Sequence, residues 1–226
     1  MTNQDNIITI DGPAGSGKGT VAKMVAVKKG YSYLDTGAMY RTIDLAVLNE
    51  GVEISNESGV LDLLNKTQID TEYKKDEELK IFLNGTDVSG DIRTPAISKL
   101  SSDIAKIKPV REFLVKLQRR IGQKGKIVVE GRDMGTYVFP GAKYKFYLDA
   151  TAEERASRRY KQLNKENNTE VQSYEDVLKE IKTRDKQDME RKESPLHPAP
   201  NAVIIDATSL TPSEVVVKII KSTEAA

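Results

Sequence analysis

The chain has 226 residues, of which 38% are hydrophobic and 31% are charged, a composition typical of a folded protein and unlike that of a disordered or membrane chain. Because 35 basic residues are balanced by 34 acidic ones, no overall positive field is available to hold a nucleic acid or an anionic membrane, and any anion site must be local. The absence of cysteine excludes disulfides, thiolate metal sites and cysteine nucleophiles.

The sequence begins MTNQDNIITIDG, with no basic segment ahead of an apolar leader. No apolar stretch approaches the ~20 residues that a membrane-spanning helix needs. We therefore expect a cytoplasmic protein without a membrane partner. Its length allows one core with an inserted lobe rather than two large domains.

Strand and helix signals alternate at the start of the chain. Residues 7–11 are β-branched and end at Gly12, and residues 18–29 form an amphipathic helical stretch. A second short strand is predicted at residues 31–34 and a second helix at residues 38–50. This alternation predicts a parallel sheet covered by helices.

The pattern changes at residues 69–89, where apolar and polar residues alternate as in an antiparallel sheet. Asn84-Gly85 is a strong signal for a two-residue hairpin turn within it. Helices are then expected at residues 94–107 and 109–121, separated by a Lys-Pro step that disfavours one continuous helix.

The second half of the chain returns to apolar runs of the length of buried parallel strands, two of which have acidic residues at their ends. Ligands bind at the carboxyl ends of such strands. The expected elements are strands at 127–129, 145–148 and 202–205, helices at 152–164 and 174–190, and a closing helix that begins at Thr211, Pro212 and Glu214.

A phosphate-binding motif, GxxxxGK, lies between the first strand and the first helix, the context in which it is meaningful. Glycines let successive backbone N–H groups point at phosphate oxygens, and the lysine reaches the β- and γ-phosphates. We expect the loop to bind ATP through Gly12, Pro13, Ala14, Gly15, Ser16, Gly17, Lys18, Gly19 and Thr20. Gly19 departs from the Ser or Thr that usually follows the lysine, and this GKGT ending resembles the nucleoside-monophosphate kinases.

Four further motifs follow along the chain: DTGAMYR at 35–41, DVSGDIR at 87–93, EGRDMGT at 130–136 and EERASRR at 153–159. With the loop and the later run Arg184, Asp188 and Arg191, the whole chain resembles the bacterial cytidylate kinases. That resemblance implies an α/β P-loop kinase fold with a parallel sheet flanked by helices. It also implies a core at about 1–65 and 108–226, an antiparallel acceptor-nucleotide insertion at about 66–107, and a helical lid at about 155–184.

The resemblance also assigns roles to single residues. It implies that the acceptor phosphate is held by Thr36, Arg41, Arg132 and Arg191, the sugar by Arg184 and Asp188, and the base by Ser102, Arg111 and Asp133, with Tyr40 either beside CMP or packing only. It implies a catalytic set of Lys18, Arg132, Arg158, Arg159 and Arg191, with Arg155 and Arg158 also near ATP.

These residue types suit the chemistry without the family name. Joining two polyanions requires several guanidinium groups around the transferred phosphoryl group. A cytosine edge offers one amino donor and two acceptors, which a carboxylate, a hydroxyl and a guanidinium match. The acceptor phosphate is already ionised at neutral pH, so no catalytic histidine is needed, and His197 is expected to be an ordinary loop residue.

Mg²⁺ is the expected cofactor, held mostly by phosphates and water, with Thr20 as the nearest protein oxygen. Asp149, after a strand, is either a metal-orienting acid or a helix cap.

The function expected from these observations is transfer of the γ-phosphoryl group of ATP to CMP or dCMP, by a chain that is monomeric by default. Two alternatives stay open. One is a P-loop kinase acting on UMP, AMP or a non-nucleotide acid, and the other is a non-catalytic nucleotide-binding switch.

Overall fold

A five-stranded parallel sheet forms the centre of the protein, in the order β2-β6-β1-β7-β8. The computed structural model describes residues 3–73, 78–94, 97, 103–166 and 172–224. The strands are β1 (Ile7–Asp11), β2 (Ser32–Asp35), β6 (Ile127–Gly131), β7 (Tyr144–Asp149) and β8 (Val203–Asp206). Every residue of β1 and β6 is buried, as expected for central strands covered on both faces.

The strand register brings acidic side chains to one edge of this sheet. Asp11 pairs with Gly131, and Asp35 with Glu130, so the last residues of β1, β6 and β2 lie side by side. Asp149 likewise ends β7 opposite the last residue of β8. Charged groups from distant parts of the sequence therefore meet at the carboxyl ends of the strands.

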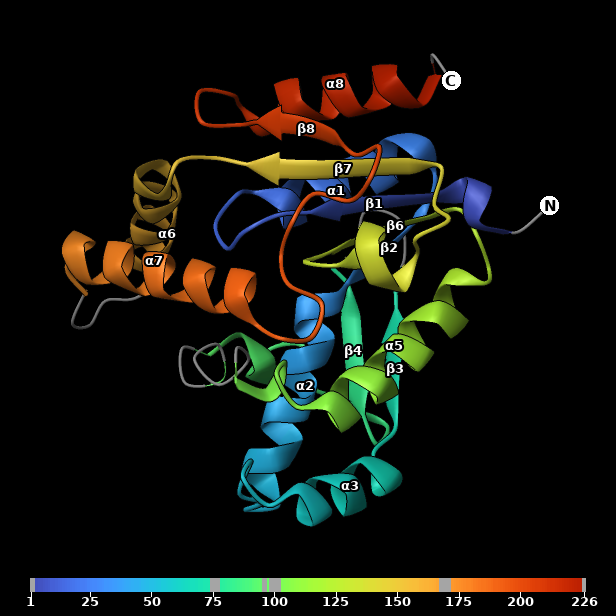
Figure 1. Ribbon diagram of the computed structural model, residues 1–226, viewed down its shortest axis with the longest axis vertical. Helices are drawn as coiled ribbons and strands as arrows, with labels where there is room; N and C mark the ends of the chain where they lie inside the picture. The colour runs from blue at the N-terminus through green and yellow to red at the C-terminus, as the bar shows by residue number, and fades with distance from the viewer. Residues whose placement is uncertain (1–2, 74–77, 95–96, 98–102, 167–171, 225–226) are drawn as a thin grey trace.

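Helices cover the sheet, and a second lobe lies below it in Figure 1. Helix α1 packs against β6, β2 and α8, while α2, α3 and α5 contact one another in the lower lobe. The bounds are α1 (Lys18–Lys29), α2 (Thr36–Asn49), α3 (Glu57–Lys66), α5 (Lys108–Gly122) and α8 (Pro212–Glu224). None of the helices in the described ranges is long and apolar enough to cross a membrane.

The lower lobe also contains a small antiparallel sheet, as the alternating pattern predicts. Its strands are β3 (Ile69–Glu72), β4 (Lys80–Leu83) and β5 (Thr86–Asp87), in that order. Asn84 and Gly85 connect β4 to β5 with φ angles of 50° and 84°, the left-handed pair that a two-residue hairpin turn requires. A short 3-10 helix, η2 (Asp91–Arg93), follows.

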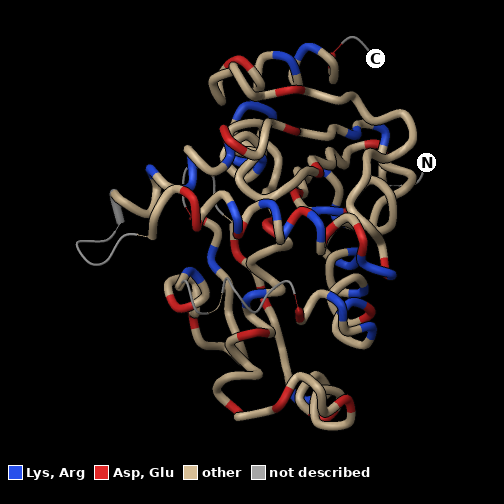
Figure 2. The backbone as a smooth tube through the Cα atoms, turned by 60° about the vertical axis from the view of Figure 1, so that its left-hand side comes forward, with Lys and Arg blue, Asp and Glu red and all other residues tan. Residues whose placement is uncertain are grey.

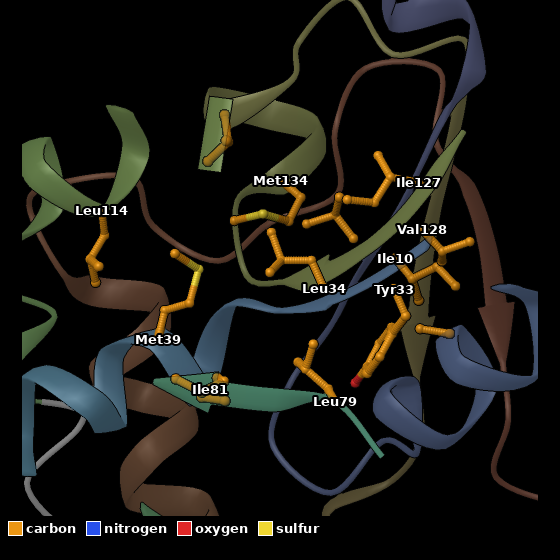
Figure 3. Packing of buried hydrophobic residues seen from close by; sticks show 14 of the residues in the cluster. Ile10, Tyr33, Leu34, Met39, Leu79, Ile81, Leu114, Ile127, Val128 and Met134 are labelled. Carbon is orange, nitrogen blue, oxygen red and sulfur yellow. The ribbon is translucent and has the colours of Figure 1, made fainter. Parts of the chain in front are cut away.

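One hydrophobic core joins the sheet to the lower lobe. Figure 3 labels residues of this one buried cluster from several elements: Ile10 and Leu34 of the sheet, Met39 of α2, Ile81 of β4 and Leu114 of α5. A smaller, separate cluster lies between α6 (Ala152–Glu166) and α7 (Tyr174–Glu190). These two helices project beside the ends to which the arrows of β7 and β8 point in Figure 1.

Most predicted elements are confirmed, with ends shifted by a few residues. Helix α3 is absent from the prediction, and the EGRDMGT segment, quoted only as a motif, forms a π-helix, η3 (Met134–Val138). The short 3-10 helix η1 (Asn3–Asn6) before β1 was also not expected. Of the helix predicted at 94–107, residues 95–96 and 98–102 lie outside the described residues.

Candidate active site

The loop after β1 has the conformation of a phosphate cradle. Gly15 and Gly17 have φ angles of 76° and 88°, a region that residues with side chains rarely adopt. At Gly12 a Cβ atom would lie 2.1 Å from the carbonyl oxygen of Leu148, so no larger residue fits there. The loop ends at the first turn of α1, where free N–H groups and the helix dipole favour an anion.

Lys18 lies inside this cradle with its side chain curled back over the loop. Its Nζ atom donates to the Pro13 carbonyl at 3.1 Å and lies 3.8 Å from Oε2 of Glu130. Burial, together with the charge of Arg132, lowers the pKa of Lys18 to about 8. The lysine is therefore a buried cation with incomplete compensation, which the phosphates of a ligand would complete.

Glu130, the partner of Lys18, explains the unusual Gly19. A Cβ atom at Gly19 would lie 3.2 Å from Oε1 of Glu130, so the absent side chain leaves room for this carboxylate. The Tyr33 hydroxyl donates to the same oxygen at 3.5 Å. Burial and the charge of Asp35 raise the pKa of Glu130 to about 7.

Four arginines gather across from the loop. Arg132 is fixed by its Nε atom, which donates to Asp188 at 2.7 Å, and Arg41 pairs with Asp35 at 3.1 Å. Burial and the charges of its neighbours Arg132, Arg41 and Arg159 lower the pKa of Arg184 to about 10. Among the described residues, the buried Nε atoms of Arg41 and Arg184 have no hydrogen-bond partner.

Such a concentration of positive charge is unfavourable without an anion, so its geometry points to a ligand phosphate. Figure 2 shows basic and acidic residues close together along the backbone in the central part of the molecule.

A second buried ion pair lies beside the arginine cluster. The NH2 atom of Arg111, on α5, donates to Oδ2 of Asp133 at 2.5 Å, and both side chains are 4% exposed. The NH1 atom of Arg111 donates to the Tyr40 hydroxyl at 3.3 Å, and Arg191 lies 3.9 Å from the other oxygen of Asp133. The pair presents a carboxylate and a guanidinium side by side, as base recognition requires.

The comparison with known proteins agrees with this geometry. The cytidylate kinase family matches residues 8–225. The chain belongs to the cytidylate kinase family. It is 49% identical over 217 residues to the cytidylate kinase of Bacillus subtilis (strain 168), with 96% of each chain covered.

It is also 48% identical over 219 residues to the cytidylate kinase of Caldanaerobacter subterraneus subsp. tengcongensis, covering 97% of this chain and 95% of that one. A solved structure of an uncharacterized protein from Eubacterium ventriosum has the same fold, with a TM-score of 0.54 at 13% identity, covering 98% of this chain and 99% of that one.

Several residues assigned by likeness to cytidylate kinases lie together in the structure. Arg132, Arg184 and Asp188 are neighbours, and Arg111, Asp133, Tyr40 and Arg191 form the adjoining group. Thr36 is buried, with its hydroxyl donating to the Glu130 carbonyl at 2.8 Å. Ser102 lies outside the described residues.

The arginines of α6 already have partners within the protein in this structure. Arg155 makes a bidentate pair with Asp185 at 2.9 and 2.6 Å and donates to the Ala14 carbonyl of the phosphate loop. Arg158 donates to Glu154 and to the Ser16 and Ala207 carbonyls. Arg159 reaches Gln162 on the surface of α6. The first two thus support the phosphate loop.

Four acidic or phenolic residues of the site were not assigned from the sequence: Asp11, Tyr33, Asp35 and Glu130. Asp35 caps α2 by accepting from Ala38 N at 2.9 Å, and its position directly before a helix was an available signal. The importance of Glu130 depends on the pairing of β6 with β1 and β2, which no local pattern reveals.

Asp149 does not cap α6. The hydroxyl of Thr151 accepts from Glu154 N at 3.3 Å in that position, while Asp149 accepts from Ala150 N.

Proposed function

We propose that this protein transfers the γ-phosphoryl group of ATP to CMP and dCMP. The observation that carries the proposal is the arrangement of three groups around one edge of the sheet: a buried loop lysine, an arginine cluster in which two buried Nε atoms have no hydrogen-bond partner among the described residues, and a buried Arg111–Asp133 pair. The first two groups suit donor and acceptor phosphates, and the third suits a base that offers an amino group. The related cytidylate kinases support the same assignment.

The chain's own residues account for catalysis by position and charge. The loop N–H groups and Lys18 bind the phosphates of ATP, while Arg41, Arg132 and Arg191 bind the acceptor phosphate. An oxygen of that phosphate attacks the γ-phosphorus in line as the bond to the β-phosphate oxygen breaks, and ADP leaves. Guanidinium groups stabilise the charge that spreads over the transferred group, and burial of the site excludes water as a competing acceptor.

We include Mg²⁺ as the cofactor. Within the described parts of the chain, no cluster of three or more His, Cys, Asp or Glu side chains could hold a metal alone. These residues fit a cation bound chiefly by ATP and water, with the exposed hydroxyl of Thr20 as the nearest oxygen after the lysine. Mg²⁺ supplies neutralisation of phosphate charge when bound.

Base selection is assigned to Asp133 and Arg111. The carboxylate would accept from the cytosine amino group, and the guanidinium would donate to the ring nitrogen or carbonyl. Uracil would turn a carbonyl toward Asp133, and facing acceptors repel. Ser102 remains part of this proposal by resemblance alone.

The proposal extends to the whole molecule. The segment at about 66–107 is the acceptor lobe, and about 155–184 is the lid that carries Arg155, Arg158 and Arg159. A monomer is proposed on the balanced charge of the chain, and a cytoplasmic location on the nucleotides that the reaction consumes.

A screen of nucleoside monophosphates with ATP and Mg²⁺ tests this function directly. Turnover should be high with CMP and dCMP and low with UMP and AMP. In Asp133→Ala the kcat/KM for CMP should fall while that for UMP changes little, so the CMP to UMP ratio drops at least ~10-fold. Equal turnover of all four acceptors, or none, would refute the proposal.

A further inference from the structure

The residue that we assign to base selection, Asp133, begins an uncommon structure. It directly precedes the π-helix η3, and its carbonyl accepts from both Tyr137 N at 2.9 Å and Val138 N at 3.1 Å. π-helices are rare and are frequently found at functional sites. The position of the Asp133 carboxylate therefore depends on what holds η3 at its two ends.

The beginning of η3 is held by Asp11, the last residue of β1. The two carboxylate oxygens of Asp11 accept from Met134 N at 2.9 Å and from Gly135 N at 2.8 Å. Asp11 is 2% exposed and lies directly before the phosphate loop. This end of the π-helix is therefore anchored to the central sheet.

The other end is held by Arg119 of α5. Its NH2 atom donates to the Tyr137 carbonyl at 2.9 Å and its Nε atom to the Val138 carbonyl at 3.1 Å. These are carbonyls at the end of a helix, which a cation also favours through the helix dipole. One planar guanidinium thus fixes two successive carbonyls, which the single ammonium group of a lysine does not reproduce.

The ring of Tyr137 connects Arg119 to the base-reading pair. The guanidinium carbon of Arg119 lies 5.6 Å from the centre of this ring, and that of Arg111 lies 6.0 Å from it. Residues 111, 115 and 119 are four apart and so share one side of α5. Tyr137 therefore lies against both arginines. A shift of η3 moves Asp133 together with the Tyr137 ring that contacts Arg111.

We propose that Arg119 is a positioning residue for base selection, acting through Tyr137 and η3 on Asp133 and Arg111 without touching the nucleotide. The inference depends on the proposed function, since it assumes that the Asp133–Arg111 pair reads the base. Loss of the two hydrogen bonds to η3 lets the carboxylate move relative to the guanidinium. A site that holds its polar groups loosely discriminates less between a base that matches and one that does not.

The test compares kcat/KM for CMP and for UMP in Arg119→Ala and Arg119→Lys. In Arg119→Ala we expect the CMP to UMP ratio to fall about three- to tenfold, with the KM for CMP raised and the KM for ATP unchanged, because charge-assisted hydrogen bonds to the exposed end of η3 are lost. Arg119→Lys keeps a cation near the ring but not the paired donors, so it should recover only part of the ratio.

Arg120→Ala is the matched control, since Arg120 is the next residue of α5 and is also exposed. Arg120→Ala should leave the CMP to UMP ratio of kcat/KM and the KM for CMP unchanged. If Arg119→Ala keeps the parental ratio, or lowers kcat equally for both acceptors, the positioning role is refuted while the function stands. If the parent protein itself does not prefer CMP, it is the proposed function that fails.

Discussion

Lys18 of the phosphate loop and Glu130 of β6 each influence the charge of the other. Both are buried, and each shifts the pKa of the other toward the charged form, against the effect of burial. Binding ATP requires a protonated lysine, so the pH dependence of kcat/KM for ATP reports the pKa of Lys18 in the free enzyme.

We predict that Glu130→Gln moves the basic limb of that profile to lower pH. The parent should lose kcat/KM for ATP as pH rises through about 8, the value to which burial and Arg132 lower the pKa of Lys18. Without the Glu130 carboxylate, the pKa of Lys18 falls further, so the loss of kcat/KM begins at a lower pH. Asp62→Asn, on the exposed face of α3, is the control. A limb that stays in place or moves to higher pH would contradict the assigned pairing.

Arg184 leads to a prediction about stability. Burial and nearby arginines lower its pKa in the folded protein to about 10. The charged form, present at neutral pH, is therefore less favourable in the folded protein than in the unfolded chain, and this lowers the free energy of unfolding. Arg184→Met should therefore raise the free energy of unfolding of the ligand-free protein by about 1–3 kcal/mol. It should also weaken the stabilisation by CMP.

Thermal denaturation with and without CMP measures both effects in Arg184→Met, and Arg120→Met is the control for a change at an exposed arginine. A variant that is less stable than the parent without ligand would show that Arg184 has a structural role.

At the level of single residues, the sequence was informative where a motif names a position. The phosphate loop was predicted from the spacing of its glycines and lysine, and the basic residues of the acceptor cluster were assigned by resemblance to the cytidylate kinases. Glu130 and Asp11 were not, because their partners come from other strands, and only the register shows that these carboxylates meet Lys18 and η3.

At the level of elements, Arg155 joins helices α6 and α7 to the phosphate loop. Arg155 of α6 pairs with Asp185 of α7 and also donates to the Ala14 carbonyl at 3.0 Å. The position of the loop and the angle between these two helices are therefore linked. The charge of Arg155 has no other carboxylate partner among the pairs found in the described residues.

We predict that Asp185→Asn disturbs the ATP side more than the acceptor side. Breaking a buried pair on one side costs roughly 3 kcal/mol, since Arg155 is left charged and poorly compensated. The KM for ATP should rise several-fold, with a smaller change in the KM for CMP, and the melting temperature should fall. Lys186→Ala, at the next position of α7, should change neither KM. An equal rise in both KM values would argue against a link to the loop.

The elements themselves differ in how well the sequence predicts them. Helix α1 and strand β1 agree with their predicted bounds, because a glycine loop and β-branched residues mark the boundary between them. The π-helix η3 could not be predicted, since its hydrogen bonds end on Asp11 and Arg119, which lie far away in the sequence. Helix α3 was missed because its capping residue, Asn56, lies in a polar stretch that resembles a loop.

At the scale of the whole molecule, α6 and α7 have a small hydrophobic core of their own. Their shared cluster of Ala156, Val177 and Ile181 is separate from the large core that joins the sheet to the lower lobe. Helices with a small core of their own open at lower free energy than the elements of the main core.

We predict that amides of α6 and α7 exchange faster than those of α1 in the free protein and gain protection when both nucleotide sites are filled. The gain follows from ligand phosphates that Arg184 and Arg159 would contact, since Arg155 and Arg158 already donate to carbonyls of the phosphate loop in the free protein. Hydrogen exchange with a bisubstrate analogue, compared with CMP alone, measures this. Equal protection with and without the analogue would mean that these helices do not act as a lid.

Asp11 is the last residue of the strand that precedes the phosphate loop, and its carboxylate also binds the turn that follows Asp133. A redesign of this protein for a new acceptor base must therefore keep the hydrogen bonds of the Asp11 carboxylate. Residues 134–138 begin where Asp11 binds Met134 N and Gly135 N, directly before the phosphate loop. Substitutions there can change base specificity without displacing ATP only if both of these hydrogen bonds are kept. Large insertions in this turn would instead separate the two reacting nucleotides.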